Sequence, residues 1–597
     1  MNFSCSGNRN KLEEAISRSG SSLLRLSGSE RWALFQDPVE IMRTESLDEV
    51  EYVIDAAEKK TKEGLHCCLM VPYDSAPAFD SALRSSRSYE IPAAWAALYK
   101  KPERLISFDD FPDSEDVEIR AKNEIAKREY FDSISRIKSL IRDGETYQVN
   151  FTFRINAAAP RAAENCFLNL FKFHRPIYGA FVNTGDLKIM SFSPELFLMK
   201  KSNILTSFPM KGTAARMPVY EEDLRAAQKL SADSKNRAEN LMITDMVRND
   251  LGRISRNGTV KTEALFKTVT TPSVHQMISI VNGTIKGNTG LMDIFRAMFP
   301  PASITGAPKV RTMSIIKEIE KSPRGIYTGT IGHISPKGDF IFNVAIRTAV
   351  VSGKNLVAGI GGGIVADSMP KSEWDEALLK SSFLKCGGSG FRVFETILFR
   401  RNEGWLWLEE HLDRLEKSQK YFLRRFDRKK INSTLLKVSP KFPSVARVKI
   451  SLSSDGTPDV EFREIVKNGW RAKKINALFS KIRTSSKNIF LYHKTSERKL
   501  YDEELKKAQT VGYDEVIFAN EKGEITEGAI TNIFAKINGG WITPPVGCGL
   551  LPGIWRSKMI AKLSAKEQVI GIEEFMSCEK IMIGNSVRDF VFAKIIK

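Results

Sequence analysis

A cluster of glycine and serine, KCGGSG at residues 385–390, restricts most strongly how this chain of 597 residues can fold. Such a cluster, placed directly after a helical pattern, favours a turn or a flexible connection. The sequence then begins afresh with a strand-like FRVFETILFR and a helix-like EEHLDRLEKSQKYF. We therefore predict an N-terminal part over 1–120, a core over 121–385, a linker at 386–390 and a second unit over 391–597.

The composition excludes several classes of protein. The net charge of +19 admits nucleic acid as a partner, but the charge is dispersed and no nucleic-acid-binding motif accompanies it, so we expect none. No apolar run reaches the roughly 18 residues of a membrane span, and the N-terminus lacks the apolar segment of a secretory signal. Seven sparse cysteines without zinc-ligand spacing fit a reducing compartment. We expect a cytoplasmic protein that does not enter a membrane.

A lysine in apolar surroundings, Lys211 in FPMKGTAAR, needs an explanation. Lysine is seldom buried, because desolvating its ammonium group is costly. Either the side chain extends to solvent, which is the common case, or its amine takes part in chemistry. The stretch alone leaves both interpretations open.

Carboxylates occur in two clusters that lie far apart in the sequence. Glu239 lies in KNRAENLMITDMVRNDLGR, and Glu373 and Glu376 lie in PKSEWDEALLK, where the i, i+3 spacing puts both on one helix face. Oxygen ligands of this kind suit Mg²⁺. A solvated helix face explains each cluster equally well, although the glycine-rich GIGGGIVADS before the second cluster lets the backbone approach a ligand closely.

Further polar residues interrupt apolar segments. His275 lies in TPSVHQMISIV, and Ser303 lies just before a predicted helix start at Ala307-Pro308, where free N–H groups suit an anion. Arg347 lies in the strand-like FNVAIRTAVV, where it requires a carboxylate or phosphate partner. For Arg347, a structural salt bridge and a bound anion are equally good explanations.

These stretches together resemble the chorismate-utilising enzymes. The matching motifs include GETYQVNFTFRI, SFSPELF, PMKGTAAR, TGAPKVRTM, RGIYTGTIG and GGGIVADSMPKSEWDEALLK, in order from about 120 to 383. The resemblance implies an α+β fold, in which two large antiparallel sheets pack as a β-sandwich-like core with helices outside. It implies Mg²⁺ at Glu239, Glu373 and Glu376, holding the carboxylate of chorismate. It also implies substrate contacts from His275, Ser303, Tyr327, Arg347 and Gly363.

The resemblance also gives Lys211 a role. Anthranilate synthases have alanine at this position, whereas PMKGT is similar to the P-I-K-G-T of aminodeoxychorismate synthases. The implied chemistry is covalent: the Lys211 amine attacks the chorismate ring and Glu195, in SPELF, acts as the general acid. Because the sequence has no glutaminase motif, the implied ammonia source is a separate glutamine amidotransferase subunit.

A second lysine, Lys494 in FLYHKTSERKL, is the centre of a different set. Glu527 follows in a predicted hairpin, Gly553 precedes a helix start that suits a phosphate, and Arg414 lies upstream in HLDRL. A lysine, a carboxylate and an anion cradle are what a protein contributes to pyridoxal-phosphate chemistry. Taken singly, Lys494 is also consistent with a surface lysine and Glu527 with a strand-edge charge.

The ordered set resembles fold-type IV pyridoxal-phosphate enzymes over about 391–590. The motifs are FETI, HLDRL, YHKTS, EGAITNIF and LLPGIWR. The resemblance implies two small α/β domains with the cofactor between them, Lys494 as the Schiff-base lysine and Glu527 as the partner of the pyridine nitrogen. Such enzymes are usually dimers. Contacts to the cofactor phosphate are implied for Arg414, Ile554, Trp555 and Ser586.

Together the two resemblances imply a bifunctional enzyme of 4-aminobenzoate formation for folate. The first unit would make 4-amino-4-deoxychorismate, and the second would be an aminodeoxychorismate lyase that releases pyruvate. An amino-acid aminotransferase in the second unit remains the alternative, because the motifs separate the two poorly and Glu497 stands where many members have asparagine. Anthranilate synthesis by the first unit is a further alternative.

Overall fold

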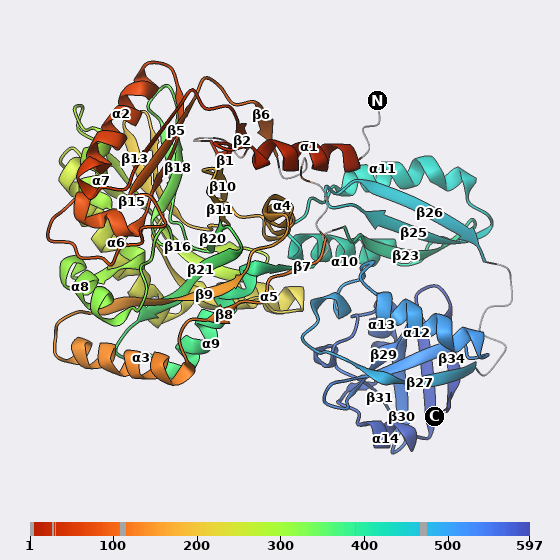
Figure 1. The fold of residues 1–597 in the computed structure, drawn as a ribbon. Coiled ribbons are helices and arrows are strands. Elements are labelled where there is room, and N and C mark those ends of the chain that lie inside the picture. The colour runs from red at the N-terminus through yellow and green to blue at the C-terminus, as the bar shows by residue number, and fades with distance from the viewer. Residues whose placement is uncertain are drawn as a thin grey trace. The chain divides into compact units, whose positions relative to one another are not determined.

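The computed structural model describes residues 5–26, 29, 31–107, 111, 115–387, 390–465 and 475–596. The chain divides into two compact units (Figure 1). One comprises Met1–Arg216 and Ala226–Ser389, and the other comprises Met217–Arg225 and Gly390–Lys597. Residues 388 and 389 of the predicted linker lie outside the described residues.

The first unit contains two large antiparallel sheets, and we call the one that includes β9 the first sheet. Its longest pair joins β9 and β21 in unbroken register from Asn355 opposite Ala158 to Ile364 opposite Val149. In spatial order its strands are β17 (Gly306–Ala307), β9 (Gln148–Ala158), β21 (Asn355–Ile364), β20 (Thr348–Ser352), β11 (Leu187–Ser191), β10 (Ala180–Asn183), β1 (Ser22–Arg25), β2 (Trp32–Phe35) and β6 (Arg104–Ile106), with β8 (Lys122–Asn123) beside β9.

The second sheet is likewise antiparallel in all its recorded pairs. A register shift interrupts the pairing of β14 with β16 between Met210 and Thr213, so Lys211 lies at an irregular part of the ladder. In spatial order the strands are β14 (Met210–Ala215), β16 (Val274–Thr284), β13 (Ile204–Ser207), β12 (Leu196–Lys201), β19 (Phe340–Asn343), β18 (Thr330–Ile334), β4 (His66–Val71), β5 (Ala94–Tyr99) and β3 (Glu40–Thr44), with β15 (Lys261–Thr270) beside β16. A separate short pair joins β7 (Val117–Glu118) and β22 (Lys385–Cys386).

The two sheets share one buried core. Leu24 and Phe35 of the first sheet belong to the same hydrophobic cluster as Met70, Trp95 and Ile331 of the second. Alternate residues of a strand point to opposite faces, so each sheet turns one apolar set towards this cluster and another towards helices. The predicted core of two packed antiparallel sheets is thereby confirmed.

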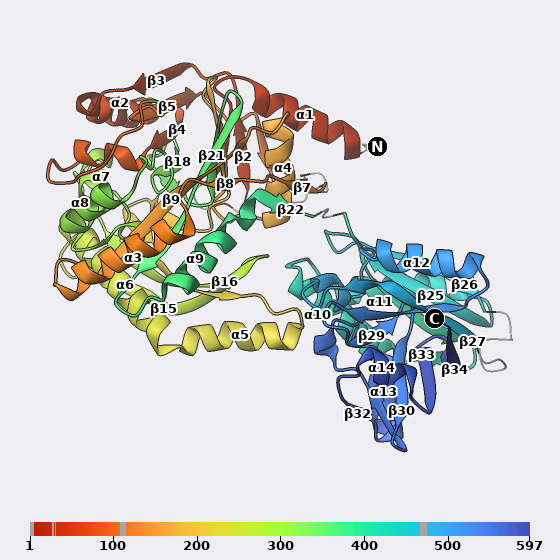
Figure 2. The same ribbon diagram turned by 60° about the horizontal axis from the view of Figure 1, so that its bottom comes forward.

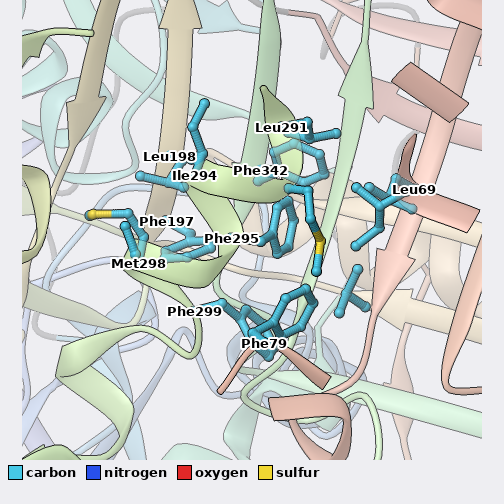
Figure 3. Packing of buried hydrophobic residues seen from close by; sticks show 14 of the residues in the cluster. Leu69, Phe79, Phe197, Leu198, Leu291, Ile294, Phe295, Met298, Phe299 and Phe342 are labelled. Carbon is cyan, nitrogen blue, oxygen red and sulfur yellow. The ribbon is translucent and has the colours of Figure 1, made fainter. Parts of the chain in front are cut away.

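Helices cover the outer faces of the sheets. On the second sheet, α7 contributes Phe295 to a cluster that also contains Leu69, Phe197 and Phe342 (Figure 3). On the other side, α3 lies beside α9, which contacts β21 (Figure 2). The helices are α1 (Cys5–Ser17), α2 (Val50–Lys62), α3 (Lys127–Arg142), α4 (Ala163–His174), α6 (Ser234–Ile254), α7 (Leu291–Met298), α8 (Lys309–Ile319) and α9 (Pro370–Lys380); α5 (Tyr220–Ala232) begins in the segment assigned to the second unit.

The second unit contains two sheets of its own. The smaller is antiparallel, in the order β24 (Gly404–Trp405), β23 (Val393–Arg400), β25 (Val445–Leu452) and β26 (Pro458–Glu464). The larger is mixed, in the order β29 (Ile525–Gly528), β28 (Glu515–Asn520), β27 (Ile475–Thr484), β34 (Asp589–Ile596), β33 (Lys580–Asn585), β30 (Asn532–Ile537), β31 (Gly540–Thr543) and β32 (Lys566–Glu567).

Each of these sheets has its own helices and its own buried cluster, as predicted for two small α/β domains. The smaller sheet packs against α10 (Leu408–Tyr421) and α11 (Arg428–Val438). The larger packs against α12 (Lys499–Thr510) and α13 (Ile554–Leu563), and α14 (Ile572–Met576) adds Phe575 to its core. Across the described ranges, the helices lack the combination of length and apolar character that a membrane span requires.

Candidate active sites

Lys211 borders a cavity of about 310 Å³ in the first unit. Burial lowers the pKa of its amine, and the nearby ammonium of Lys380 lowers it further. Lys380 is itself held in place, since its Nζ lies 2.8 Å from Oε1 of Glu376 and donates to the Gly361 carbonyl at 2.9 Å. An amine in this setting gives up its proton more readily than an exposed lysine, which a nucleophile requires.

Glu195 borders the same cavity and lies just before β12. The residue is 4% exposed, and the Ser303 hydroxyl donates to its Oε1 at 2.6 Å. Burial raises the pKa of this carboxyl to about 7, against the opposing effects of Ser303 and Lys211. A carboxyl with this pKa is partly protonated at neutral pH and is suited to proton transfer.

Three carboxylates reach the cavity from two helices. The Asp233 side chain caps α6 by accepting from the Asn236 N–H at 2.8 Å, and Glu239 follows in the second turn. Glu373 and Glu376 come from α9. Burial raises the pKa of Glu239 and of Glu373, whereas Lys380 lowers the pKa of Glu376.

The remaining predicted substrate contacts of this cavity come from loops and one strand. Arg347 precedes β20, and burial lowers its pKa to about 10. Tyr327 precedes β18, and burial raises its pKa to about 12. Gly363 on β21 leaves room for the ends of two side chains, because a Cβ there would lie 2.8 Å from Nε2 of Gln148 and 2.9 Å from Nζ of Lys211.

His275 is the predicted substrate contact that lies elsewhere. Its neighbours Val274 and Gln276 border the cavity, but His275 does not. The ring is 1% exposed, and its Nδ1 lies 3.0 Å from the Thr270 hydroxyl. The expectation differs from the structure because side chains alternate along β16, so Gln276 rather than His275 faces the cavity. We leave His275 out of the proposed site.

Lys494 borders a larger cavity, of about 680 Å³, in the second unit. Burial lowers the pKa of its amine to about 8, with a further contribution from Arg414. Its carbonyl accepts from the Phe394 N–H at 2.9 Å, which fixes the backbone of Lys494 to β23. The amine also lies 4.9 Å from the centroid of the Phe394 ring.

Glu527 borders this cavity from β29 and is 6% exposed. Its Oε2 accepts from the Leu551 N–H at 3.1 Å. Burial nevertheless raises the pKa of the carboxyl to about 8, above the opposing effects of that bond, Arg498 and Lys494. A buried carboxyl in this state is suited to a basic, proton-binding partner such as a pyridine nitrogen.

Arg414 on α10 is fixed by a buried carboxylate. Its Nε and Nη2 donate to the two oxygens of Glu395 at 2.7 and 2.8 Å, and its Nη1 donates to the Pro552 carbonyl at 3.0 Å. Nδ1 of His411 lies 2.6 Å from Glu395 as well. The two partners hold the pKa of Glu395 at about 2, despite its burial. Glu395 therefore positions both basic side chains beside the cavity.

The first turn of α13 also borders the cavity. Ile554 and Trp555 follow the N-cap Gly553, so their backbone N–H groups lie at a helix N-terminus, which suits an anion. A Cβ on Gly553 would lie 1.8 Å from Oδ1 of Asn532, so this close approach requires glycine. Ser586 borders the cavity from the turn between β33 and β34.

Comparison with protein-family models decides the relationship. Residues 22–385 match the model described as chorismate binding enzyme. The chain belongs to the family of chorismate binding enzymes. Residues 392–596 match the model of amino-transferase class IV, so the chorismate-binding core is followed by a class IV aminotransferase domain.

Individual relatives match the chorismate-binding core. The chain is 36% identical over 259 residues to aminodeoxychorismate synthase component 1 of Escherichia coli, which covers 43% of this chain and 57% of the relative. The same protein of Bacillus subtilis is 37% identical over 249 residues, covering 42% and 53%. The chain thus spans little more than half the length of these relatives.

A solved structure supports the fold of the same core. Anthranilate synthase component I from Streptococcus pneumoniae superposes with a TM-score of 0.52 at 24% identity, covering 60% of this chain and 93% of that one. At this identity the likeness concerns the fold alone.

The acidic residues of the chorismate-binding core have the chemistry that Mg²⁺ prefers. Burial and mutual repulsion raise the pKa of Glu239 and Glu373, and a divalent cation would relieve both effects. Within the described ranges, however, no three His, Cys, Asp or Glu side chains are already assembled for a metal. Beside Glu376 the ammonium of Lys380 supplies the positive charge. The donors fit the ion, but their arrangement here is that of an ion pair.

The class IV domain fits pyridoxal phosphate on several observations. Lys494 and Glu527 border one cavity with Arg414, Ile554, Trp555 and Ser586. Nε2 of His411, which borders the same cavity, is buried without a hydrogen-bond partner among the described residues. An orphaned polar atom next to a fixed guanidinium and a helix N-terminus is what a phosphate-bearing ligand would satisfy.

Two groups near Lys211 were not predicted from the sequence. Lys380 forms an i, i+4 pair with Glu376, a spacing that PKSEWDEALLK already displays. Gln148, in the YQVN motif, is fully buried, and both its amide atoms are without partners in the described residues. Its side chain approaches that of Lys211 near Gly363, where β9 and β21 of the first sheet meet β14 of the second, so only the folded chain reveals it.

Proposed function

We propose that the chain is a bifunctional enzyme that converts chorismate and ammonia to 4-aminobenzoate by way of 4-amino-4-deoxychorismate. The observation that carries the first step is the shared cavity of Lys211 and Glu195, in which the amine loses its proton more readily and the carboxyl less readily than usual. Relatives at 36–37% identity are aminodeoxychorismate synthase components, which favours the same reaction.

In the first step Lys211 acts as a nucleophile. Its neutral amine forms a bond to C2 of the chorismate ring while the C4–O bond breaks, and Glu195 donates a proton so that the hydroxyl leaves as water. Ammonia then forms a bond to C4 as the C2–N bond to Lys211 breaks, and the proton lost by ammonia restores Glu195. The sum is chorismate plus ammonia to aminodeoxychorismate plus water.

The other groups of this cavity bind and orient the substrate. Arg347 and Tyr327 supply donors for its carboxylate and hydroxyl oxygens, whereas the Ser303 hydroxyl, which donates to Glu195, can accept from a substrate hydroxyl. Mg²⁺, when bound by Glu239, Glu373 and Glu376, would supply positive charge to a substrate carboxylate. The ammonia would come from a separate glutamine amidotransferase subunit.

In the second step the class IV domain would release pyruvate from aminodeoxychorismate. Bound pyridoxal phosphate would withdraw electrons from the amine-bearing carbon, with Glu527 at its pyridine nitrogen. Lys494 takes the proton from C4, the C3–O bond breaks, and the ring becomes aromatic as enolpyruvate leaves and is protonated to pyruvate. The pKa of about 8 lets Lys494 accept and return this proton near neutral pH.

The remaining parts of the proposal follow from this reaction. The product is the aromatic precursor of folate, and the enzyme acts in the cytoplasm, with dimerisation through the class IV domain. Two alternatives stay open: amino-acid transamination by the second unit, and anthranilate formation by the first.

A single set of reactions tests the proposal. The purified chain is incubated with chorismate, ammonium, Mg²⁺ and pyridoxal phosphate at mildly alkaline pH, with and without a 2-oxo acid, and products are separated by chromatography. We expect 4-aminobenzoate and pyruvate without any 2-oxo acid. Accumulation of aminodeoxychorismate would reject the lyase step, transamination that requires the 2-oxo acid would favour the aminotransferase, and anthranilate would reject the assignment of the first unit.

A further inference from the structure

One face of the smaller sheet in the second unit presents positive charge to the cavity of Lys494. Along β25, Val448 and Ile450 are fully buried in the core of this sheet, whereas Arg447 and Lys449 border the cavity. The alternation follows from the period of two along a strand. The proposed reaction does not use either cation.

Arg447 has like charges on two sides. Its directly opposite residue on β26 is Arg463, and like charges in such a cross-strand pair repel. Arg588, which also borders the cavity, lies close enough that Arg447 adds to the lowering of its pKa by burial, although Glu515 opposes the change. No salt bridge of the described residues includes Arg447. A bound anion would relieve this repulsion.

The cations lie within the same cavity as the reacting amine. Two of the lysines lie near the ring of Phe394, with Nζ of Lys494 at 4.9 Å from the centroid and Nζ of Lys449 at 5.1 Å. Among the described residues, the ion pair of Lys449 is with Glu461, at the long separation of 4.0 Å. A ligand that reaches Lys494 with one end therefore has its other end within range of a cationic surface.

We propose that Arg447, Lys449 and Arg588 form a subsite for a carboxylate that the substrate carries away from its amine-bearing carbon. This inference rests on the proposed function and deepens it, because aminodeoxychorismate has two carboxylates and neither is on C4. In an α-amino acid, by contrast, a carboxylate is attached to the reacting carbon itself. The subsite thus selects a dianionic, ring-based amine.

Kinetics of the second step test the subsite, with aminodeoxychorismate supplied directly to the holoenzyme. Arg447→Gln should raise KM by roughly 10- to 100-fold, the range for losing a charge-assisted contact, and leave kcat within about twofold. Arg447→Lys should restore part of the affinity. Arg463→Gln is the matched control, because it removes an exposed arginine of β26 that does not border the cavity, so KM should rise by no more than about twofold.

A binding measurement keeps the subsite testable without turnover. Isophthalate, a ring with two carboxylates, and benzoate, with one, are titrated against the holoenzyme, and the absorbance of the cofactor reports occupancy. We expect isophthalate to bind more tightly than benzoate, with most of that preference lost in Arg447→Gln and kept in Arg463→Gln.

The two measurements separate the inference from the proposed function. If wild type makes 4-aminobenzoate but Arg447→Gln keeps both its KM and its preference for isophthalate, the subsite is wrong and the lyase assignment stands. If wild type binds isophthalate through Arg447 yet makes no 4-aminobenzoate, the lyase assignment is wrong and the anion subsite stands.

Discussion

The two lysines that the sequence singles out are both made less basic, but by differently built surroundings. Beside Lys211 the second cation is Lys380, paired with Glu376 at side-chain exposures of 32% and 47%. Beside Lys494 the second cation is Arg414, which pairs with Glu395; their side chains are 14% and 1% exposed. In each unit burial lowers the pKa of the lysine most, and the neighbouring cation is the second largest cause.

The difference lies in how firmly the neighbouring cation is held. The Glu376–Lys380 pair is partly solvated, so a bound ion or substrate can separate its members at modest cost. The Glu395–Arg414 pair is buried and bidentate, and breaking it would leave an unpaired charge inside the unit. The first cavity is thus adjustable around its lysine, whereas the second is built around a fixed guanidinium group.

The largest expected effect comes from removing either lysine. Lys211→Ala should lower aminodeoxychorismate formation by about 10³-fold or more, because the covalent step is lost, while lyase activity on supplied aminodeoxychorismate persists. Lys494→Ala should do the reverse and let aminodeoxychorismate accumulate. Product analysis by chromatography measures both. Lys201→Ala, at an exposed position of β12, is the control; a fully active Lys211→Ala would remove the chemical role assigned to that lysine.

Removing the acid of the first cavity should have the next largest effect. Glu195→Gln should reduce the first step by roughly 10²- to 10⁴-fold, since the amide cannot donate the proton. In wild type the rate should rise with pH as Lys211 loses its proton, and fall as pH passes about 7 and Glu195 loses its own. Rates measured from pH 5 to 9 should show that the variant lacks the fall. A fall of equal size in the variant would assign it to another group.

Releasing the fixed cation of the second unit should have a smaller effect on chemistry. Glu395→Gln removes the carboxylate that positions Arg414 and His411, so we expect pyridoxal phosphate to bind roughly 10- to 100-fold more weakly. Equilibrium dialysis with absorbance detection measures the change. Glu403→Gln, which removes an exposed pair with Arg400, should change nothing. Unchanged cofactor affinity in Glu395→Gln would show that Arg414 needs no such anchor.

The smallest effect is expected at the adjustable pair of the first unit. Lys380→Met removes a cation beside Lys211, which raises the pKa of that amine, so the rising limb of the pH profile should move to higher pH. At neutral pH the first step should slow a few-fold. Measuring the profile at saturating Mg²⁺ and chorismate separates this shift from weaker binding. If the rising limb of the pH profile does not move in Lys380→Met, burial alone sets the pKa of Lys211.

The motifs predicted the members of both cavities to different degrees. In the second unit every predicted residue borders the cavity, although these residues come from a helix, a strand, loops and a helix start. In the first unit the predicted contact His275 does not border the cavity. The apolar run around it does not indicate which of the two alternating sets of side chains on β16 faces the cavity. Lys380 was missed although its pairing with Glu376 is visible in the i, i+4 spacing.

The sequence alone determined which family the core resembles, where two units meet and which lysine we propose for each unit, because motifs of fixed spacing and the glycine cluster are local properties of the chain. Tertiary structure decided the surroundings of those lysines, and therefore the pKa of each amine. Burial beside Lys380 or Arg414, and the approach of Gln148 to Gly363 across β9 and β21, join residues distant in sequence. A pKa depends on desolvation and on charges nearby in space, and only the folded chain fixes both.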